Sequence, residues 1–474
     1  MTAKRQVYLL DPQKIPPETI AVTFAKTSRA PQSFREIAAE LSAEKSAEFH
    51  EKWVVGYGHA SVAEHAVLHI AVENISRLAV EVLESNRLAS YTEKSTRYQK
   101  WNRDAFYIPA ELDGHPLRDT FIQTCQLLFD TYQESLPEVQ AVVGADNPRK
   151  PEESDAAWER RLRSKYVDVC RFLLPAASMA NVGMTINARA LEHALSKMLS
   201  HPLAEVQQTG AEIKQVALES VPTLVKYAEA VPYWQSSAAS LTQAARDLNL
   251  RVQPEDWCQL VSSDPAVENR ALAAALYRFS DLSYAQCLQQ VQDSAQPGRD
   301  RLARLLLAER AQHDIPLREL EFASYTFDLI LDQGAYFELK RHRMMTQTPQ
   351  PLTARLGYAL PRQMAAAGFE ERYRKAMQAA QNCYEEIAEF NPHVASYIVP
   401  NAFNRRVLLG CNWRSLDHFI SLRSAPNAHF SLRRVAQRMA AETRSVTPLL
   451  GSYLRPNPDE TWQGIETDNF NTVR

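Results

Sequence analysis

Two stretches of the chain, residues 189–229 and 414–444, carry apolar residues at the three- and four-residue spacing of amphipathic helices. Strand-like patterns are shorter and fewer, and they cover residues 7–10, 67–72 and 324–331. Glycine is scarce, with 13 residues in 474, while Ala, Leu, Glu, Arg and Gln dominate long stretches, which favours helices. The pattern therefore predicts an α+β fold in which helices are in the majority.

Short motifs recur in the same order in the two halves of the chain, which indicates an internal duplication. In each half an Asn-x-Arg triplet begins twelve residues after a proline, and a histidine follows the arginine by four. Residues 107–109 (YIP) and 359–361 (ALP) also correspond. We expect two copies of one fold, residues 1–238 and 239–474, each of ordinary domain size. The repeated residues are Pro175, Asn187, Arg189 and His193 in the first copy, and Pro400, Asn412, Arg414 and His418 in the second.

Composition narrows the class of ligand and the compartment. The net charge of −3 gives no sign of a broad surface for nucleic acid, and a small anionic ligand fits that balance better. The six cysteines form no C-x-x-C pair, which is typical of a reduced intracellular protein. No signal peptide and no 18-residue apolar stretch occur, so we expect a cytoplasmic protein without a membrane span. G-x-G-x-x-G and P-loop motifs are also absent.

Three consecutive residues of the second copy, Arg341, His342 and Arg343, could form part of a phosphate-binding site. They cannot all face one side of a helix, but in a strand or loop they can approach phosphate and ring edges from different directions. A guanidinium group donates two parallel hydrogen bonds to a phosphate. Taken alone, such a triplet is more often a solvated basic patch, so the interpretation needs a second segment.

The first copy contains a second segment at residues 93–98, which read EKSTRY. In an extended conformation Glu93, Ser95 and Arg97 lie on one face, because side chains alternate along a strand. That face combines donors for a phosphate with an acceptor for a base or ribose. An ordinary polar strand is the alternative for a match this short.

Together the two segments resemble the motif of flavin-dependent thymidylate synthases, in which Arg-His-Arg is followed after seven residues by Ser-x-Arg-Tyr. The first copy keeps Ser-x-Arg-Tyr but only the last arginine of the triplet, Arg87. The second copy keeps Arg-His-Arg but has Pro351 in place of the serine. Residues 58–65 (GHASVAEH) resemble the family segment that lies against the flavin, and the second copy has only residues 320–322 (LEF) there.

Two further arginines of the family occur in one copy each. The family has an arginine sixteen residues before its Asn-x-Arg, and at that position the first copy has Arg171 and the second has Ser396. Nine residues after the triplet the second copy has the family's other arginine, Arg423, where the first has Met198. The resemblance thus implies one composite nucleotide site, because each copy keeps what the other has lost. Its substrate contacts would be Glu93, Ser95, Arg97, Arg171, Arg341 and Arg423.

The resemblance also implies a reaction, in which FAD, NADPH and methylenetetrahydrofolate serve the methylation of dUMP at C5 without a protein nucleophile. Arg423 would be the catalytic residue, because it would stabilise negative charge that develops on the pyrimidine ring. A homodimer of the fused chain would mimic the homotetramer of the family. The candidate flavin contacts are His59, Ser61, Glu64, Asn187, Arg189, His193, Arg341, His342, Arg343, Asn412, Arg414 and His418.

Two departures from the family leave other functions open. Glu338 replaces a glutamine, and its carboxylate would repel a phosphate unless it faces away. Thr92 replaces an asparagine. The alternatives are C5 one-carbon transfer to another pyrimidine nucleotide and a nucleotide-binding homologue that has lost the flavin.

A metal site is a further alternative, because His59, His65 and His69 lie close in sequence to Glu64 and Glu73. If this segment were helical, His65 and His69 would share one face, which is a metal-binding arrangement. The HExxH order and a distant Cys or Asp cluster are absent. We therefore expect no metal.

Overall fold

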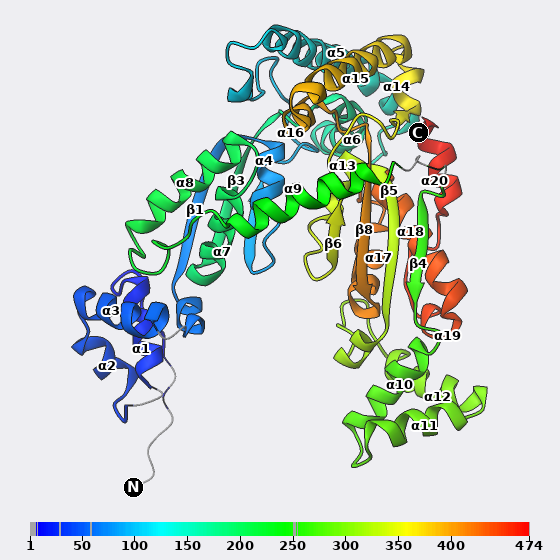
Figure 1. Cartoon of the computed structure of the whole chain (residues 1–474). Coiled ribbons are helices and arrows are strands. Elements are labelled where there is room, and N and C mark those ends of the chain that lie inside the picture. The colour runs from blue at the N-terminus through cyan, green and yellow to red at the C-terminus, as the bar shows by residue number, and fades with distance from the viewer. Residues whose placement is uncertain are drawn as a thin grey trace. The chain divides into compact units, whose positions relative to one another are not determined.

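The computed structural model describes residues 6, 8–27, 30–56, 59–249, 253 and 255–473 (Figure 1). Helices outnumber strands in this part of the chain, and its strand pairs are antiparallel, so the predicted helix-rich α+β class is confirmed. No helix among the described residues is long and apolar enough to cross a membrane.

The chain divides into two compact units, and each unit is built from several separate segments. The units cut across the two copies, because two segments of the first copy fold with the second copy. Unit 1 consists of Met1–Lys94, Phe106–His115 and Ala177–Arg251, and unit 2 consists of Ser95–Ala105, Pro116–Ala176 and Val252–Arg474.

Unit 1 has a three-stranded sheet with the order β1-β3-β2, and helices precede and follow its strands. Its α-helices are α1 (Pro17–Thr27), α2 (Phe34–Glu40), α3 (Ala43–Phe49), α4 (Arg77–Leu83), α7 (Ala188–Leu199), α8 (Ala204–Leu218) and α9 (Pro232–Asp247). Its other helical segments are the π-helix η1 (His50–Gly56) and the 3₁₀ turns η2 (Ala60–His65) and η3 (Ala110–Leu112). Its strands are β1 (Val67–Ser76), β2 (Ala89–Glu93) and β3 (Met179–Asn187).

Unit 2 has a four-stranded sheet with the order β4-β5-β8-β6 and a small sheet of β7 and β9. Its strands are β4 (Cys258–Ser263), β5 (Ser324–Asp332), β6 (Thr346–Pro349), β7 (Leu360–Pro361), β8 (Asn404–Asn412) and β9 (Phe470–Thr472). Its 3₁₀ turns are η4 (Arg171–Leu173), η5 (Arg318–Phe322) and η6 (Ser396–Ile398). Its α-helices are α5 (Leu117–Asp146), α6 (Asp155–Cys170), α10 (Val267–Arg278), α11 (Tyr284–Asp293), α12 (Gln296–Leu307), α13 (Gln333–Leu339), α14 (Arg362–Ala366), α15 (Glu370–Phe390), α16 (Pro392–Ala395), α17 (Trp413–Arg423), α18 (Phe430–Val446), α19 (Pro448–Gly451) and α20 (Trp462–Asn469).

The strand predictions at 67–72 and 324–331 are confirmed by β1 and β5. The prediction at 7–10 is wrong where it can be compared: residue 7 lies outside the described residues, and residues 8–10 form no strand. Leu9 is 94% exposed, so its segment lacks the cover that would stabilise a strand. The helical stretch 189–229 is interrupted near Pro202, because proline cannot continue the helical hydrogen bonding.

The order of elements repeats in the two copies. Among their elements, both copies contain in this order a strand, a short helix, a strand, a long helix, a 3₁₀ turn, a strand and two helices. The three strands pair in the same order, β1-β3-β2 in the first copy and β5-β8-β6 in the second. Matching backbone bonds join the strand ends, from Ala188 N to Ala66 O at 2.8 Å and from Trp413 N to Ala323 O at 2.7 Å. These bonds support the duplication inferred from the motifs.

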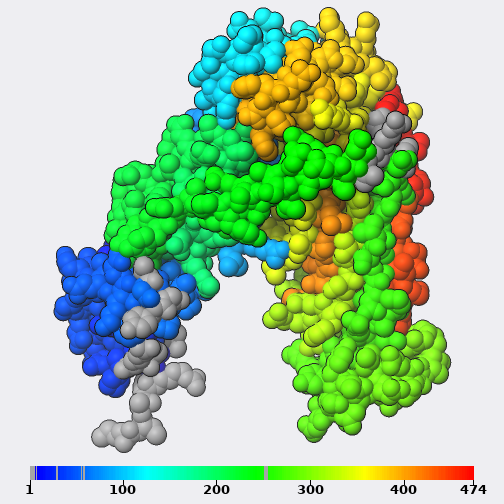
Figure 2. All heavy atoms as spheres, in the orientation of Figure 1, coloured from blue at the N-terminus to red at the C-terminus, as the bar shows by residue number. Residues whose placement is uncertain are grey.

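The core of unit 2 lies between its four-stranded sheet and the helices that follow β8. Alternate residues of β5, including Tyr325 and Phe327, are buried, as expected for a strand with one face on a core. They join Val407 of β8, Leu416 of α17 and Met439 of α18 in one apolar cluster. Helices α10, α11 and α12 form a further helical group, visible in light green in the space-filling view (Figure 2).

The two copies meet within unit 2. The long helices α5 and α15 pack together, one from each copy (Figure 1). Pro175 forms an antiparallel bridge with its counterpart Pro400. On either side of the bridge, Ala176 N donates to Val399 O and Asn401 N donates to Leu174 O, both at 3.0 Å. The segment that carries Arg171 is thereby fixed against the second copy.

Candidate functional site

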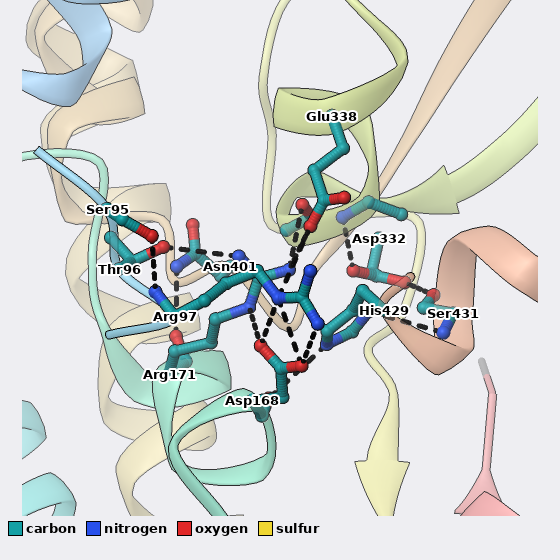
Figure 3. Close-up of polar contacts among 12 residues, drawn as sticks. Ser95, Thr96, Arg97, Asp168, Arg171, Asp332, Glu338, Asn401, His429 and Ser431 are labelled. Atoms are coloured by element: carbon teal, nitrogen blue, oxygen red, sulfur yellow. Dashed lines mark hydrogen bonds and ion pairs between the residues drawn. The ribbon is translucent and has the colours of Figure 1, made fainter. Parts of the chain in front are cut away.

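Arginines and carboxylates from both copies form one group in unit 2, which we call the arginine cluster. Figure 3 shows several of its side chains pointing toward one another. The segment after β2, the end of α6, helix α13 and the end of α17 all contribute. The arginine cluster consists of Arg97, Asp168 and Arg171 from the first copy, and Glu338 and Arg423 from the second.

Arg97 makes a two-pronged ion pair with Asp168. Its Nε donates to Oδ1 at 2.9 Å and its Nη2 donates to Oδ2 at 2.7 Å, while Nη2 also donates to the carbonyl oxygen of Asn427 at 3.1 Å. Burial alone would lower the pKa of Arg97, but the hydrogen bonds and charge of Asp168 raise it. Arg97 is therefore charged at every ordinary pH. Its Nη1 remains as a donor group that no described residue engages.

Glu338 joins the two copies electrostatically. Its Oε1 lies 3.4 Å from Nη2 of Arg171 and 3.9 Å from Nε of Arg97. Its Oε2 accepts from Nη1 of Arg423 at 3.0 Å. Burial would raise the pKa of Glu338, but the charges of Arg171, Arg97 and Arg423 outweigh it and lower the pKa. The carboxylate that departs from the family pattern thus faces the arginines and does not turn away from them.

Arg171 lies deepest, with 3% of its side chain exposed. Its Nη1 donates to Thr96 Oγ1 at 3.1 Å, and its Nη2 donates to the carbonyl oxygen of Gly334 at 3.3 Å. Its own carbonyl oxygen accepts from Nδ2 of Asn401 at 2.9 Å (Figure 3). These contacts use much of the donor capacity of Arg171. Arg171 therefore helps to position Glu338 and Asp168, and it also supplies a positive charge.

Arg423, at the end of α17, is held on three sides. Besides its bond to the Glu338 carboxylate, its Nη2 donates to the Glu338 carbonyl oxygen at 3.3 Å. Its Nε donates to Nε2 of His342 at 2.9 Å. Burial, Arg341 and Arg97 lower the pKa of Arg423, and Glu338 raises it. A guanidinium stays protonated in proteins, so Arg423 remains a cation.

Glu93 has a different environment. Strand β2 ends at Glu93, and residues 96–98 form a turn, so the expected single extended face of residues 93–97 is wrong. Its buried carboxylate pairs with Arg77 at 2.8 Å within unit 1, whereas Ser95 and Arg97 belong to unit 2. The Oγ of Ser95 accepts from the backbone N of Arg97 at 3.2 Å, which shapes the turn.

Arg341, His342 and Arg343 lie in the turn between α13 and β6, as expected for a triplet that cannot share one helix face. Arg341 is exposed, and its charge helps to lower the pKa of Glu338. His342 is buried between Phe419 and His418, with ring centroids at 4.9 and 5.7 Å.

The candidate flavin residues lie in both units, and several have structural partners. Asn187 and Asn412 cap α7 and α17, where their side chains accept backbone N–H groups of Ala190 and Ser415. Equivalent ion pairs join Arg189 to Glu64 at 2.5 Å in unit 1 and Arg414 to Glu321 at 2.7 Å in unit 2. The remaining polar candidates His59, Ser61, His193 and His418 are exposed.

Three residues that contact Arg97 or Arg171 were not predicted as site residues from the sequence: Asp168, Thr96 and Asn401. Asp168 precedes Arg171 by three residues at the end of a helix, a spacing at which side chains are neighbours. Thr96 and Asn401 gave no such signal.

His65 and His69 do not form the helical pair considered from the sequence. His65 ends η2 and His69 lies in β1, where its Nδ1 contacts Thr185 Oγ1 at 2.9 Å, so the two histidines do not share a helix face. In the described part of the chain no group of three His, Cys, Asp or Glu residues could hold a metal ion.

Comparison with protein-family models shows to which family the chain belongs. The model of the family described as thymidylate synthase complementing protein matches residues 10–223 and 259–449. The chain belongs to this family. The two matched segments correspond to the two copies, so the fused duplication predicted from the motifs is confirmed.

Two sequence relatives agree with this assignment. A UPF0159 protein of Chlamydia muridarum is 35% identical over 438 residues, which cover 88% of this chain and 82% of the relative. A flavin-dependent thymidylate synthase of Thermococcus onnurineus is 29% identical over 236 residues, covering 48% of this chain and 81% of the relative. The structure of a Helicobacter pylori flavin-dependent thymidylate synthase complexed with FAD and dUMP gives a TM-score of 0.31 at 19% identity, covering 42% of this chain and 99% of that one. The matched part of the Thermococcus enzyme thus has about the length of one copy.

Proposed function

We propose that the chain is a flavin-dependent methyltransferase that acts on C5 of dUMP, with one nucleotide site assembled from both copies within unit 2. The arginine cluster carries this proposal. Its members come from segments as distant as Arg97 and Arg423, yet they contact the same carboxylate, Glu338. Two independently functioning tandem sites would not require such shared contacts.

The donors that remain in the arginine cluster suit a nucleotide. Arg97 keeps Nη1, and the charge of the exposed Arg341 adds to that of the arginines near Glu338. Four arginines (Arg97, Arg171, Arg341, Arg423) against two carboxylates leave a surplus of positive charge, which favours a phosphate monoester. Arg423 would stabilise negative charge on the pyrimidine ring from a preorganised position.

The candidate flavin residues of the second copy have side chains of the types that bind a flavin. Arg341, Arg343 and the exposed His418 supply cations and ring nitrogens suited to its phosphates and ring edges, and they would hold it on the side of the second copy. When bound, FAD would supply the redox chemistry of the reaction, with NADPH and methylenetetrahydrofolate as co-substrates. The chain itself would contribute binding, orientation and electrostatics. A homodimer would provide two such sites.

The decisive experiment combines cofactor content with nucleotide dependence. The purified protein should be yellow, should oxidise NADPH faster when dUMP is present, and should support growth of a thymidine-requiring host. Arg97→Ala and Arg341→Ala should each abolish dUMP binding, although the residues lie in different copies. Arg103→Ala is the matched control, because Arg103 forms a surface pair with Asp130. Colourless protein that binds no added FAD would exclude the flavoenzyme, and normal dUMP binding by either variant would exclude the composite site.

Glu338 favours a second candidate, C5 one-carbon transfer to a different pyrimidine nucleotide. Its carboxylate occupies donors of Arg171 and Arg423 that would otherwise be available to a phosphate or ribose. Mass spectrometry of products from a panel of pyrimidine nucleotides separates the two candidates. A product other than thymidylate would replace dUMP in the proposal.

A further inference from the structure

The imidazole ring of His342 contacts the guanidinium group of Arg423. The ring is buried, with 8% of the residue exposed, and packs edge-on against Phe419 at a centroid distance of 4.9 Å and an interplanar angle of 83°. Its backbone is also fixed, because its N donates to Leu339 O and its carbonyl oxygen accepts from the side chain of Gln347. The imidazole therefore has little freedom to rotate toward another partner.

The contact with Arg423 defines the tautomer of His342. Arginine can only donate, so the imidazole Nε2 at 2.9 Å must be the acceptor. The ring is then neutral and carries its proton on Nδ1. Burial first, and then the charges of Arg423, His418 and Arg341, lower the pKa of His342 to about 3, which agrees with a neutral ring.

The donors of Arg423 can be assigned one by one. A guanidinium group has five N–H bonds, one on Nε and two on each Nη. His342 takes the Nε–H, and the carboxylate and carbonyl oxygens of Glu338 take one bond on each Nη. Two N–H bonds remain, one on each Nη. No described residue accepts from these two bonds, so they could donate to a carbonyl oxygen or a ring nitrogen.

We propose that His342 is a positioning residue, which holds Arg423 through Nε2 so that the two remaining Nη donors face the pyrimidine. This inference rests on the proposed function, because it assumes that Arg423 meets the substrate ring. It departs from the expectation that His342 contacts the flavin, since the Nε2 that would serve a ligand is committed to Arg423.

The first copy contains a parallel contact. Ser85, Asn86 and Arg87 correspond to the Arg-His-Arg triplet, and Lys197 is adjacent to the counterpart of Arg423. Lys197 Nζ donates to Asn86 Oδ1 at 3.1 Å and to Ser85 Oγ at 2.6 Å. In both copies the middle residue of the triplet thus supplies an acceptor to a cation near the end of an equivalent helix, which is α7 in the first copy and α17 in the second. The contact is a feature of the fold, and in the second copy its cation is the arginine of the proposed site.

Two substitutions test the role of Nε2. His342→Gln keeps an acceptor oxygen near the place of Nε2, whereas His342→Asn has a shorter side chain that cannot reach it. We expect His342→Asn to lower kcat on the order of 10- to 100-fold, the usual cost of a misplaced reacting group, with a much smaller change in the KM for dUMP. His342→Gln should recover most of kcat. In an Arg423→Lys background the two variants should differ little, because the contact that separates them is gone.

A second measurement does not depend on activity. In protein labelled with ¹⁵N-histidine, the His342 signal, assigned by its loss in His342→Gln, should show a neutral ring with an unprotonated Nε2 at neutral pH. Equal kcat in His342→Asn and His342→Gln, at equal melting temperature, would overturn the positioning role, as would a protonated Nε2. If the tautomer is as stated but the wild type neither binds nor converts pyrimidine nucleotides, the proposed function fails, and the contact is structural only.

Discussion

Burial and neighbouring cations keep His342 neutral in the folded protein. Its pKa is about 3 there, against an ordinary value of 6.5. Between these pH values the unfolded chain binds a proton at His342 that the folded chain does not. The contribution of His342 to the free energy of unfolding is therefore complete above about pH 6.5 and decreases as the pH falls. The slope from this one group is about 1.4 kcal/mol per pH unit in the middle of the window.

We therefore expect the urea midpoint of unfolding to fall between pH 7 and pH 5 by more in the wild type than in His342→Gln, which cannot titrate. Other groups titrate in both proteins and cancel in the comparison. Parallel midpoints over this range would show that His342 has an ordinary pKa in the folded state.

The negative charge of Glu338 should affect how tightly the site binds an anionic ligand. Replacing it with glutamine keeps the shape but removes one negative charge from among Arg97, Arg171 and Arg423. We expect Glu338→Gln to bind dUMP more tightly, by about tenfold or roughly 1.4 kcal/mol, and deoxyuridine unchanged. The protein should also be less stable, because the buried Arg171 and the partly buried Arg97 and Arg423 lose a counter-charge.

Calorimetric titration with both ligands measures the effect of Glu338→Gln. Glu134→Gln is the control, since Glu134 pairs with Arg372 at the surface. An equal change for nucleotide and nucleoside would contradict an electrostatic origin.

At the scale of elements, Asn187 and Asn412 begin equivalent helices in the two copies. Both side chains accept a hydrogen bond from the backbone three residues on, which satisfies a donor that the helix leaves open. Asn187→Ala and Asn412→Ala should each lower the free energy of unfolding by about 1 kcal/mol, and substitution by Asp should restore it. Denaturation measures stability, and absorbance measures flavin content. A loss of flavin in Asn412→Asp at full stability would show a ligand role beyond capping.

The repeated elements could be predicted because their signals are local. The strands that start near Val67 and Ser324 depend on residues a few positions apart. The ion pairs could not be predicted in the same way. Arg77 with Glu93, and Arg97 with Asp168, join residues whose proximity depends on how the chain turns between them. The extended face expected for residues 93–97 failed for this reason, since a turn follows Glu93.

At the scale of the whole molecule, the copies of the sequence and the compact units of the structure are different divisions. Residues 116–176 of the first copy belong to unit 2, where α5 covers α15 of the second copy. On the side of α15 that meets α5, the buried side chain of Cys383 lies beside Thr124 and Cys125. Burial of side-chain surface between the two helices stabilises unit 2. The second copy therefore lacks part of its own core.

Separate expression of the two copies tests this division. Residues 239–474 alone would expose the inner face of α15 and would leave Glu338 without Arg97 and Arg171. We expect this fragment to be insoluble or unfolded by circular dichroism, and to become soluble when residues 1–238 are expressed with it. As a control, the full chain is allowed to fold and is then cut at a protease site inserted after the exposed Leu248. The cut protein should remain one species in size-exclusion chromatography, because α5 and α6 of the first fragment stay packed in unit 2. A stable, monomeric, folded fragment 239–474 would show that the second copy folds without the first, and that unit 2 does not depend on the fusion.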